Sequence, residues 1–184
     1  TKSKSYGGYA NYNRTPSHFV FPIPDQISSE HAAPILCGGV TAYIPLKKYG
    51  AKGKLVGVIG LGGLGHFAVL FAKALGAKEV AVISRSHAKE EDAKKLGADR
   101  FIATDDKGWD QGSNAASLDL IISTVSSEKI PLAGYLNLLS FRATFVQVGA
   151  PEDPLPAFPA FALIAKAAYI TGSWIGSPKE ITEM

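Results

Sequence analysis

The sequence contains very little sulfur, since only one of its 184 residues is cysteine and only one is methionine. The single cysteine, Cys37, excludes a disulfide within the chain and any zinc site built on a Cys-x-x-Cys pair. The sequence also lacks an apolar run of about 20 residues, the length that spans a membrane. We therefore expect a protein without a membrane segment.

Charge of one sign is not concentrated anywhere along the chain. The formal net charge is +3 and no block of Lys and Arg stands out, so nothing argues for a nucleic-acid partner. Hydrophobic residues make up 46% and charged residues 19%, which is typical of a globular domain with a real core. The stretch from Thr1 to Gly8 is polar rather than signal-like, and we expect a cytoplasmic protein.

From residue 53 onward, short apolar runs alternate with helical patterns. Such runs suit strands that are buried on both faces of a parallel sheet. The predicted strands are 54–59, 80–83, 101–103, 118–122, 144–148 and 169–171. The predicted helices are 64–75, 87–96, 132–139 and 158–165, preceded by one that runs from Ser28 or Ser29 towards Thr41. This alternation predicts an α/β protein with a doubly wound parallel sheet of six strands, a Rossmann fold.

A glycine-rich loop lies between the first predicted strand and the helix that follows it. Its sequence, Gly60-Leu61-Gly62-Gly63-Leu64-Gly65, fits the GxGxxG pattern of dinucleotide-binding proteins. In that pattern the glycines permit a tight turn, close approach to a pyrophosphate, and close packing of helix on strand. Free amides and the helix dipole then favour phosphate. The motif alone leaves two alternatives open, a turn without a ligand and the glycine-rich turn of methyltransferases.

The residues after the second predicted strand distinguish NAD from NADP. An NAD site usually has Asp or Glu about 20 residues beyond the glycine motif, where the carboxylate binds the ribose 2′-hydroxyl. Here the sequence is Ser84-Arg85-Ser86, with Lys89 one helical turn after the arginine. Arg85 offers a planar fork of donors to a 2′-phosphate, and Lys89 adds a point charge. We therefore predict tighter binding of NADP(H) than of NAD(H).

These motifs resemble the zinc-dependent medium-chain alcohol dehydrogenases, and most of all their NADP-dependent cinnamyl-alcohol-dehydrogenase branch, including its fungal members. The resemblance covers nearly the whole chain. Its most specific parts are the segment 32–41, which contains Cys37, and the turn Ser84-Arg85-Ser86. Other matching stretches are Gly8-Tyr9-Ala10, His18-Phe19-Val20, Pro45-Leu46-Lys47, residues 71–77, Leu96-Gly97-Ala98-Asp99 and residues 176–181.

The resemblance implies roles for further residues. Cys37 matches the last of the three protein ligands of the catalytic zinc, and Thr41 lies next to the nicotinamide, where it would join a proton relay. The other cofactor contacts that the resemblance implies are Thr124, Val125, Ser126, Val148, Gly149, Ser173, Trp174 and Ile175. The loops that follow strands are also where a doubly wound sheet binds its ligand.

Most zinc ligands of that family have no counterpart in the sequence. The family's catalytic zinc also takes a Cys and a His-Glu motif, and its structural zinc takes four closely spaced cysteines; neither set is present. One thiol does not replace three protein ligands. We therefore expect a fragment, in which residues 1–40 are a remnant of the catalytic domain and 41–184 form the NADP-binding domain. Alone it would bind NADP(H), hold no zinc at Cys37 and lack turnover.

The resemblance implies that the complete enzyme passes hydride between NADP(H) and a primary alcohol or aldehyde, with zinc polarising the carbonyl. Two alternatives stay open, a zinc-free NADPH reductase of the quinone type and a non-catalytic dinucleotide-binding module. The resemblance further implies a homodimer that forms through the edge strand near Tyr169 to Ile175. An exposed apolar edge of a sheet favours such pairing.

Overall fold

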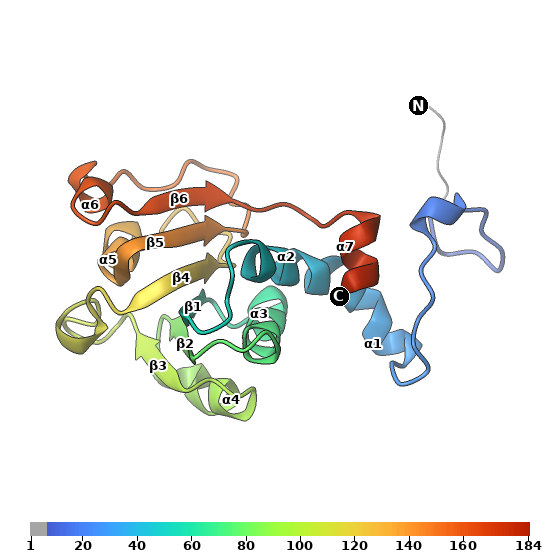
Figure 1. The fold of residues 1–184 in the computed structure, drawn as a ribbon, viewed down its shortest axis with the longest axis horizontal. Helices are drawn as coiled ribbons and strands as arrows, with labels where there is room; N and C mark the ends of the chain where they lie inside the picture. The colour runs from blue at the N-terminus through green and yellow to red at the C-terminus, as the bar shows by residue number, and fades with distance from the viewer. Residues whose placement is uncertain (1–6) are drawn as a thin grey trace.

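The computed structural model describes residues 7–184, so the first six residues of the expected 1–40 segment lie outside the described residues. Six strands form one sheet, and every neighbouring pair is parallel. They are β1 (Leu55–Ile59), β2 (Glu79–Ser84), β3 (Arg100–Ala103), β4 (Leu118–Ser123), β5 (Leu139–Gln147) and β6 (Tyr169–Gly172). Their spatial order is β3-β2-β1-β4-β5-β6 (Figure 1). The predicted α/β fold with a doubly wound, six-stranded parallel sheet is confirmed.

Seven α-helices and several shorter turns connect or flank these strands in the described part of the chain. The α-helices are α1 (Ser29–Pro34), α2 (Val40–Lys48), α3 (Gly63–Ala74), α4 (Glu90–Lys95), α5 (Leu132–Asn137), α6 (Phe161–Ile164) and α7 (Pro178–Glu183). A π-helical turn (Ile35–Gly39) joins α1 to α2, and 3-10 turns lie at Ser17–Phe19, His87–Lys89 and Gly112–Asn114. Among residues 7–184, no helix has the length and apolar character needed to cross a bilayer.

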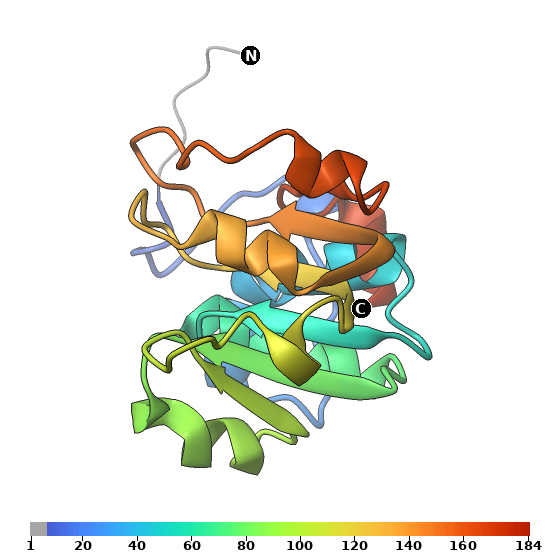
Figure 2. The same cartoon turned by 90° about the vertical axis from the view of Figure 1, so that its left-hand side faces the viewer.

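In strands β1, β2 and β4, successive side chains point to opposite faces of the sheet, and most of them are buried. Val58 of β1 and Val82 of β2 belong to a core that includes the apolar sides of α2 and α3. Helix α5 covers the other face (Figure 2). There, Ile83 of β2 and Phe145 of β5 pack with the apolar side of this helix. This burial on two faces explains why the strands appear in the sequence as continuous apolar runs.

Several predicted boundaries differ from the structure, and three of these differences have a clear local cause. The helix predicted to run towards Thr41 continues to Lys48, after a π-helical turn that follows Pro34, a residue without a backbone N–H to donate. The helix predicted at 158–165 is shorter because Pro159 disfavours helix before it. Strand β5 begins five residues earlier than predicted, since a register shift against β4 and a positive φ at Arg142 disturb its alternation.

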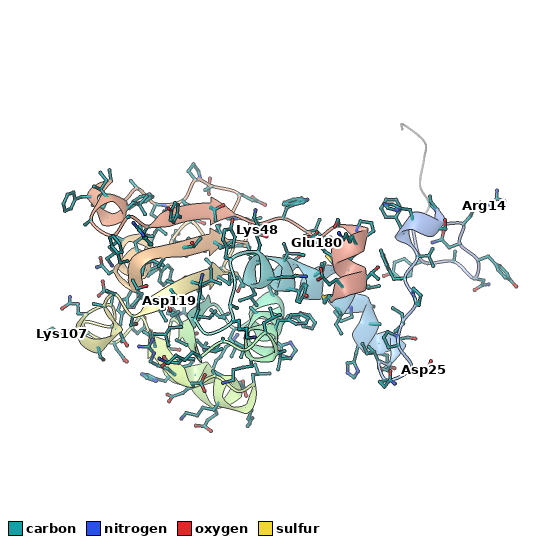
Figure 3. All side chains as sticks on the ribbon, in the orientation of Figure 1. Arg14, Asp25, Lys48, Lys107, Asp119 and Glu180 are labelled. Carbon is teal, nitrogen blue, oxygen red and sulfur yellow. The ribbon has the colours of Figure 1, made fainter. Side chains whose placement is uncertain are left out.

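A half-buried carboxylate fixes three central strands at the amino end of the sheet. Asp119 of β4, labelled in Figure 3, accepts a hydrogen bond from the backbone N–H of Leu55 at 3.0 Å. Its other oxygen accepts from the hydroxyl of Ser140 at 2.8 Å. The side chain therefore joins β4 to β1 and β5, and the sequence pattern gave no sign of this role.

The N-terminal segment and α7 lie together at one end of the molecule (Figure 1). An apolar cavity of about 350 Å³ lies between them, with Phe21, Leu36 and Ile181 among its lining residues. Helix α7 begins with a capping box, in which Ser177 and Glu180 bond each other's backbone N–H. The cap fixes the start of α7, which the sequence analysis did not predict.

Replacing Asp119 with alanine tests the tie between the strands. We expect Asp119→Ala to lower the free energy of unfolding by about 1–3 kcal/mol, because the N–H of Leu55 loses its acceptor. Asp119→Asn keeps an acceptor oxygen, so it should lower the free energy of unfolding clearly less than Asp119→Ala does. Urea unfolding of the three proteins measures both differences. Equal midpoints for all three would contradict this role.

Candidate cofactor-binding site

A cavity of about 980 Å³ opens at the carboxyl ends of β1 to β4. Strands β2 and β4 flank β1, so successive strands depart from β1 in opposite directions along the sheet. This is the switch point at which doubly wound sheets bind their ligands. The predicted site residues that line the cavity are Gly60, Leu61, Gly62, Gly63, Leu64, Ser84, Arg85, Ser86, Lys89, Thr124 and Val125.

The glycine loop leads directly from β1 into α3, and each glycine meets a different constraint. Gly60 has a φ of +85°, a backbone conformation that favours glycine. A side chain at Gly65 would collide with the carbonyl oxygen of Gly60. At Gly62 and Gly63, in contrast, an added Cβ would meet nothing within 4 Å. The start of the twelve-residue helix α3 is therefore open to the cavity and suited to an anion.

The turn after β2 forms the second wall of the cavity. Arg85 is exposed, and no ion pair among residues 7–184 engages its guanidinium. The ammonium of Lys89 donates to the carbonyl oxygen of Leu61 at 2.8 Å, which ties this wall to the glycine loop. An ammonium has three donors, so this bond leaves others for a ligand. The arrangement presents two cations beside the open start of α3.

The loops after β4 and β5 form one hydrogen-bonded unit beside the glycine loop. The hydroxyl of Thr124 donates to the carbonyl oxygen of Ile59 at 2.8 Å. The side-chain amide of Gln147 donates to the carbonyl oxygens of Val125 at 3.1 Å and Gly149 at 2.7 Å. These bonds fix the third wall of the cavity.

The remaining predicted contacts do not line the cavity. They are Thr41, Gly65, Ser126, Val148, Gly149, Ser173, Trp174 and Ile175. Gly65 lies beneath the loop, and Ser126 accepts from the N–H of Ala150 at 3.0 Å, within the unit formed by the loops after β4 and β5. The N–H of Ser173 donates to the carbonyl oxygen of Gln147 at 3.1 Å, which holds the residues after β6 at the same edge of the sheet. The side chain of Trp174 is 81% exposed.

Several lining residues were missed by the sequence analysis. They are Ile59, Ile83, Ala88, Thr104, Asp105, Ser127, Lys129, Ile130, Pro131 and Tyr135. Six of them lie in the loops that follow β3 and β4, so the rule that strand-end loops bind the ligand would have found them. Burial raises the pKa of Tyr135 to about 12, even further above neutral pH than its ordinary value.

Positive charge predominates along the cavity. Its lining includes three basic side chains, Arg85, Lys89 and Lys129, and one acidic side chain, Asp105. A cleft lined by an excess of one sign attracts ligands of the other sign. The cavity is therefore suited to a ligand that carries several phosphates.

The described residues do not fit a zinc ion. Cys37 is exposed on the π-helical turn before α2. Within residues 7–184, no three His, Cys, Asp or Glu side chains are grouped so that they could hold a metal. Catalytic zinc takes three protein ligands and structural zinc takes four. A zinc site at Cys37 would need ligands other than the ones described.

Known proteins resemble this chain in sequence and in structure. A sequence profile of the zinc-binding dehydrogenases matches residues 63–184. Cinnamyl alcohol dehydrogenase 2 of Rauvolfia serpentina is 48% identical over 98% of this chain and 50% of its own length. The chain thus spans about half the length of the curated relatives it matches.

Two solved structures have the same arrangement of elements. A cinnamyl alcohol dehydrogenase from Sorghum bicolor is 42% identical and superposes with a TM-score of 0.84, covering 90% of this chain and 47% of its own. A CAD from Helicobacter pylori complexed with NADP(H) is 40% identical, with a TM-score of 0.71, covering 82% of this chain and 42% of its own. The resemblance therefore includes a protein that binds this dinucleotide.

The contrast between Gly65 and Gly63 gives a test of the glycine loop. Gly65→Ala forces α3 away from the carbonyl of Gly60, and we expect it to lower the free energy of unfolding by about 1–3 kcal/mol. Gly63→Ala adds the same methyl group in open space, so it should leave that free energy unchanged or slightly raise it. Thermal unfolding followed by circular dichroism measures both. Equal effects of the two substitutions would contradict the packing role of Gly65.

Proposed function

This chain belongs to the zinc-binding dehydrogenase family, and we propose that it forms the NADP(H)-binding part of an enzyme that interconverts a primary alcohol and its aldehyde. One observation carries the proposal. The cavity at the switch point brings together the open start of α3, the exposed cation of Arg85 and the unit formed by the loops after β4 and β5. A dinucleotide phosphate needs these three features at one edge of a sheet.

Each wall of the cavity has its own part in this proposal. Backbone amides at Gly62 and Gly63 would bind the pyrophosphate, where the dipole of α3 adds a favourable field. Arg85 would bind the 2′-phosphate through its guanidinium, with Lys89 and the hydroxyl of Ser84 beside it. The nicotinamide supplies the hydride chemistry when it is bound, and this chain's residues hold and orient it.

The nicotinamide end is assigned by resemblance and by position. Thr41 on α2 and the residues Ser173 to Ile175 after β6 would border the nicotinamide, together with Val148 and Gly149 after β5. The main-chain bond from Ser173 to Gln147 supports this placement, because it holds the segment after β6 at the carboxyl edge of the sheet. Residues 41–184 would then act as the cofactor domain, with 1–40 as part of a catalytic domain.

A homodimer through β6 is part of the same proposal. Strand β6 pairs only with β5 among the described strands, so its other edge has free backbone groups. Tyr169 on this strand is 59% exposed. An exposed edge with apolar side chains favours pairing with a second copy.

Binding of NADPH and NADH tests the proposed function. We expect the chain to bind NADPH more tightly than NADH in calorimetric titrations. Arg85→Ala should weaken the binding of NADPH by about 10- to 100-fold, equivalent to the loss of about 1.5–3 kcal/mol for a hydrogen bond to a charged group. The same substitution should change the affinity for NADH far less, because NADH lacks the 2′-phosphate.

A matched control comes from the far end of the molecule. Arg14 lies on the N-terminal segment away from the sheet (Figure 3), so Arg14→Ala should leave both affinities unchanged. Equal affinities of the wild type for the two dinucleotides would refute the assignment of Arg85. Turnover of a quinone with NADPH in the presence of a chelator would instead identify a zinc-free reductase.

A further inference from the structure

His87 forms a side-chain cluster next to the phosphate turn. Its Nδ1 lies 2.8 Å from a carboxylate oxygen of Glu90 on α4. Its Nε2 lies 3.1 Å from a carboxylate oxygen of Asp106, in the loop after β3. The ring also lies 5.9 Å from the ring of Phe101 on β3, measured between centroids. The imidazole therefore joins the start of α4 to the loop that follows β3.

The same two loops meet through their main chains at the proposed phosphate site. The N–H of Thr104 donates to the carbonyl oxygen of Ser84 at 2.8 Å, and the N–H of Asp105 donates to that of Arg85 at 2.9 Å. His87 adds a side-chain link between these loops just beyond Arg85. The phosphate turn is therefore joined to the loop after β3 by two main-chain bonds and by the side chain of His87.

The two contacts of His87 require its cationic form. A neutral imidazole has one donor and one acceptor nitrogen, whereas an ionised carboxylate only accepts. Both nitrogens face carboxylates, so both must donate. In agreement, the hydrogen bonds to Glu90 and Asp106 raise the pKa of His87 above its ordinary value.

We propose that His87, in its cationic form, is a positioning residue that holds the phosphate turn for the 2′-phosphate of the cofactor. This inference rests on the proposed binding of NADP(H). The cation joins the two loops that carry Arg85 and Asp105, and it offsets the charges of Glu90 and Asp106.

The balance of charge around His87 shows why its proton matters. Glu90 and Asp106 contact the ring, and Lys94 on α4 pairs with the other oxygen of Glu90 at 3.0 Å. Arg85 and Asp105, which line the cavity, belong to the same two loops. His87 is two residues from Arg85 on the same turn, so its ionisation acts on the segment that carries the guanidinium.

The pH dependence follows from the direction of the pKa shift. The pKa of His87 is raised in the folded protein. The contribution of its cation to holding the phosphate turn is therefore complete at pH values below the ordinary histidine pKa. This contribution is lost as the pH rises through the raised pKa of His87, because the imidazole then loses its charge. Preference for NADPH over NADH should therefore decrease over that range.

The test compares the wild type with His87→Gln, which has no titrating group at this position. Affinities for NADPH and NADH are measured from about pH 6 to about pH 9. The second pKa of the 2′-phosphate is about 6, and its titration is common to both proteins. We expect the preference of the wild type for NADPH to decrease by about two- to fivefold more than that of His87→Gln.

Two further variants make the result specific to this cluster. Asp106→Asn removes one carboxylate partner, so it should lower the pKa of His87, measured by NMR, and reduce the pH effect. His31 is also exposed and bonds only Ser28 among the described residues, so His31→Gln should retain the wild-type profile. Because His87 is exposed, these variants are expected to fold.

The outcomes separate this inference from the function on which it rests. If both proteins bind NADPH and their preference for NADPH over NADH changes in the same way with pH, the role of His87 is overturned and the proposed function stands. Failure of the wild type to bind NADPH at any pH would overturn both the role of His87 and the proposed function.

Discussion

The close approach of α3 to β1 is the contact on which the proposed site depends. No side chain fits at Gly65, because its position lies against the carbonyl oxygen of Gly60. This contact brings the first turn of α3 to the carboxyl end of the central strand. Once the helix starts there, its free N–H groups and its dipole face the same space as the ends of β2 and β4. The proposed binding of a phosphate at this site rests on this placement.

Hydrogen bonds between loops then turn one edge of the sheet into a cavity of fixed shape. Lys89 reaches the glycine loop, Gln147 joins the loops after β4 and β5, and His87 joins α4 to the loop after β3. Parallel strands bring these loops to one side, and the side chains fix their spacing. These bonds constrain the loops and do not involve Arg85, whose guanidinium stays available for a ligand.

The sequence predicted those features that depend on local pattern. Continuous apolar runs gave the six strands, and the glycine motif from Gly60 to Gly65 gave the turn that leads from β1 into α3. Contacts between distant segments had no such signal. The tie from Asp119 to Leu55 and Ser140 joins residues far apart in the chain. Lys129 and Tyr135 line the cavity only because the fold brings their segments to it, and the match of Cys37 to a zinc ligand stays a prediction.

A crystal structure of the chain with NADP⁺ would test the central claim most directly. The account predicts that the 2′-phosphate lies within hydrogen-bond distance of the guanidinium of Arg85. It also predicts that the pyrophosphate lies against the amides of Gly62 and Gly63. A dinucleotide bound outside this cavity, or one whose 2′-phosphate points into solvent away from Arg85, would contradict the account.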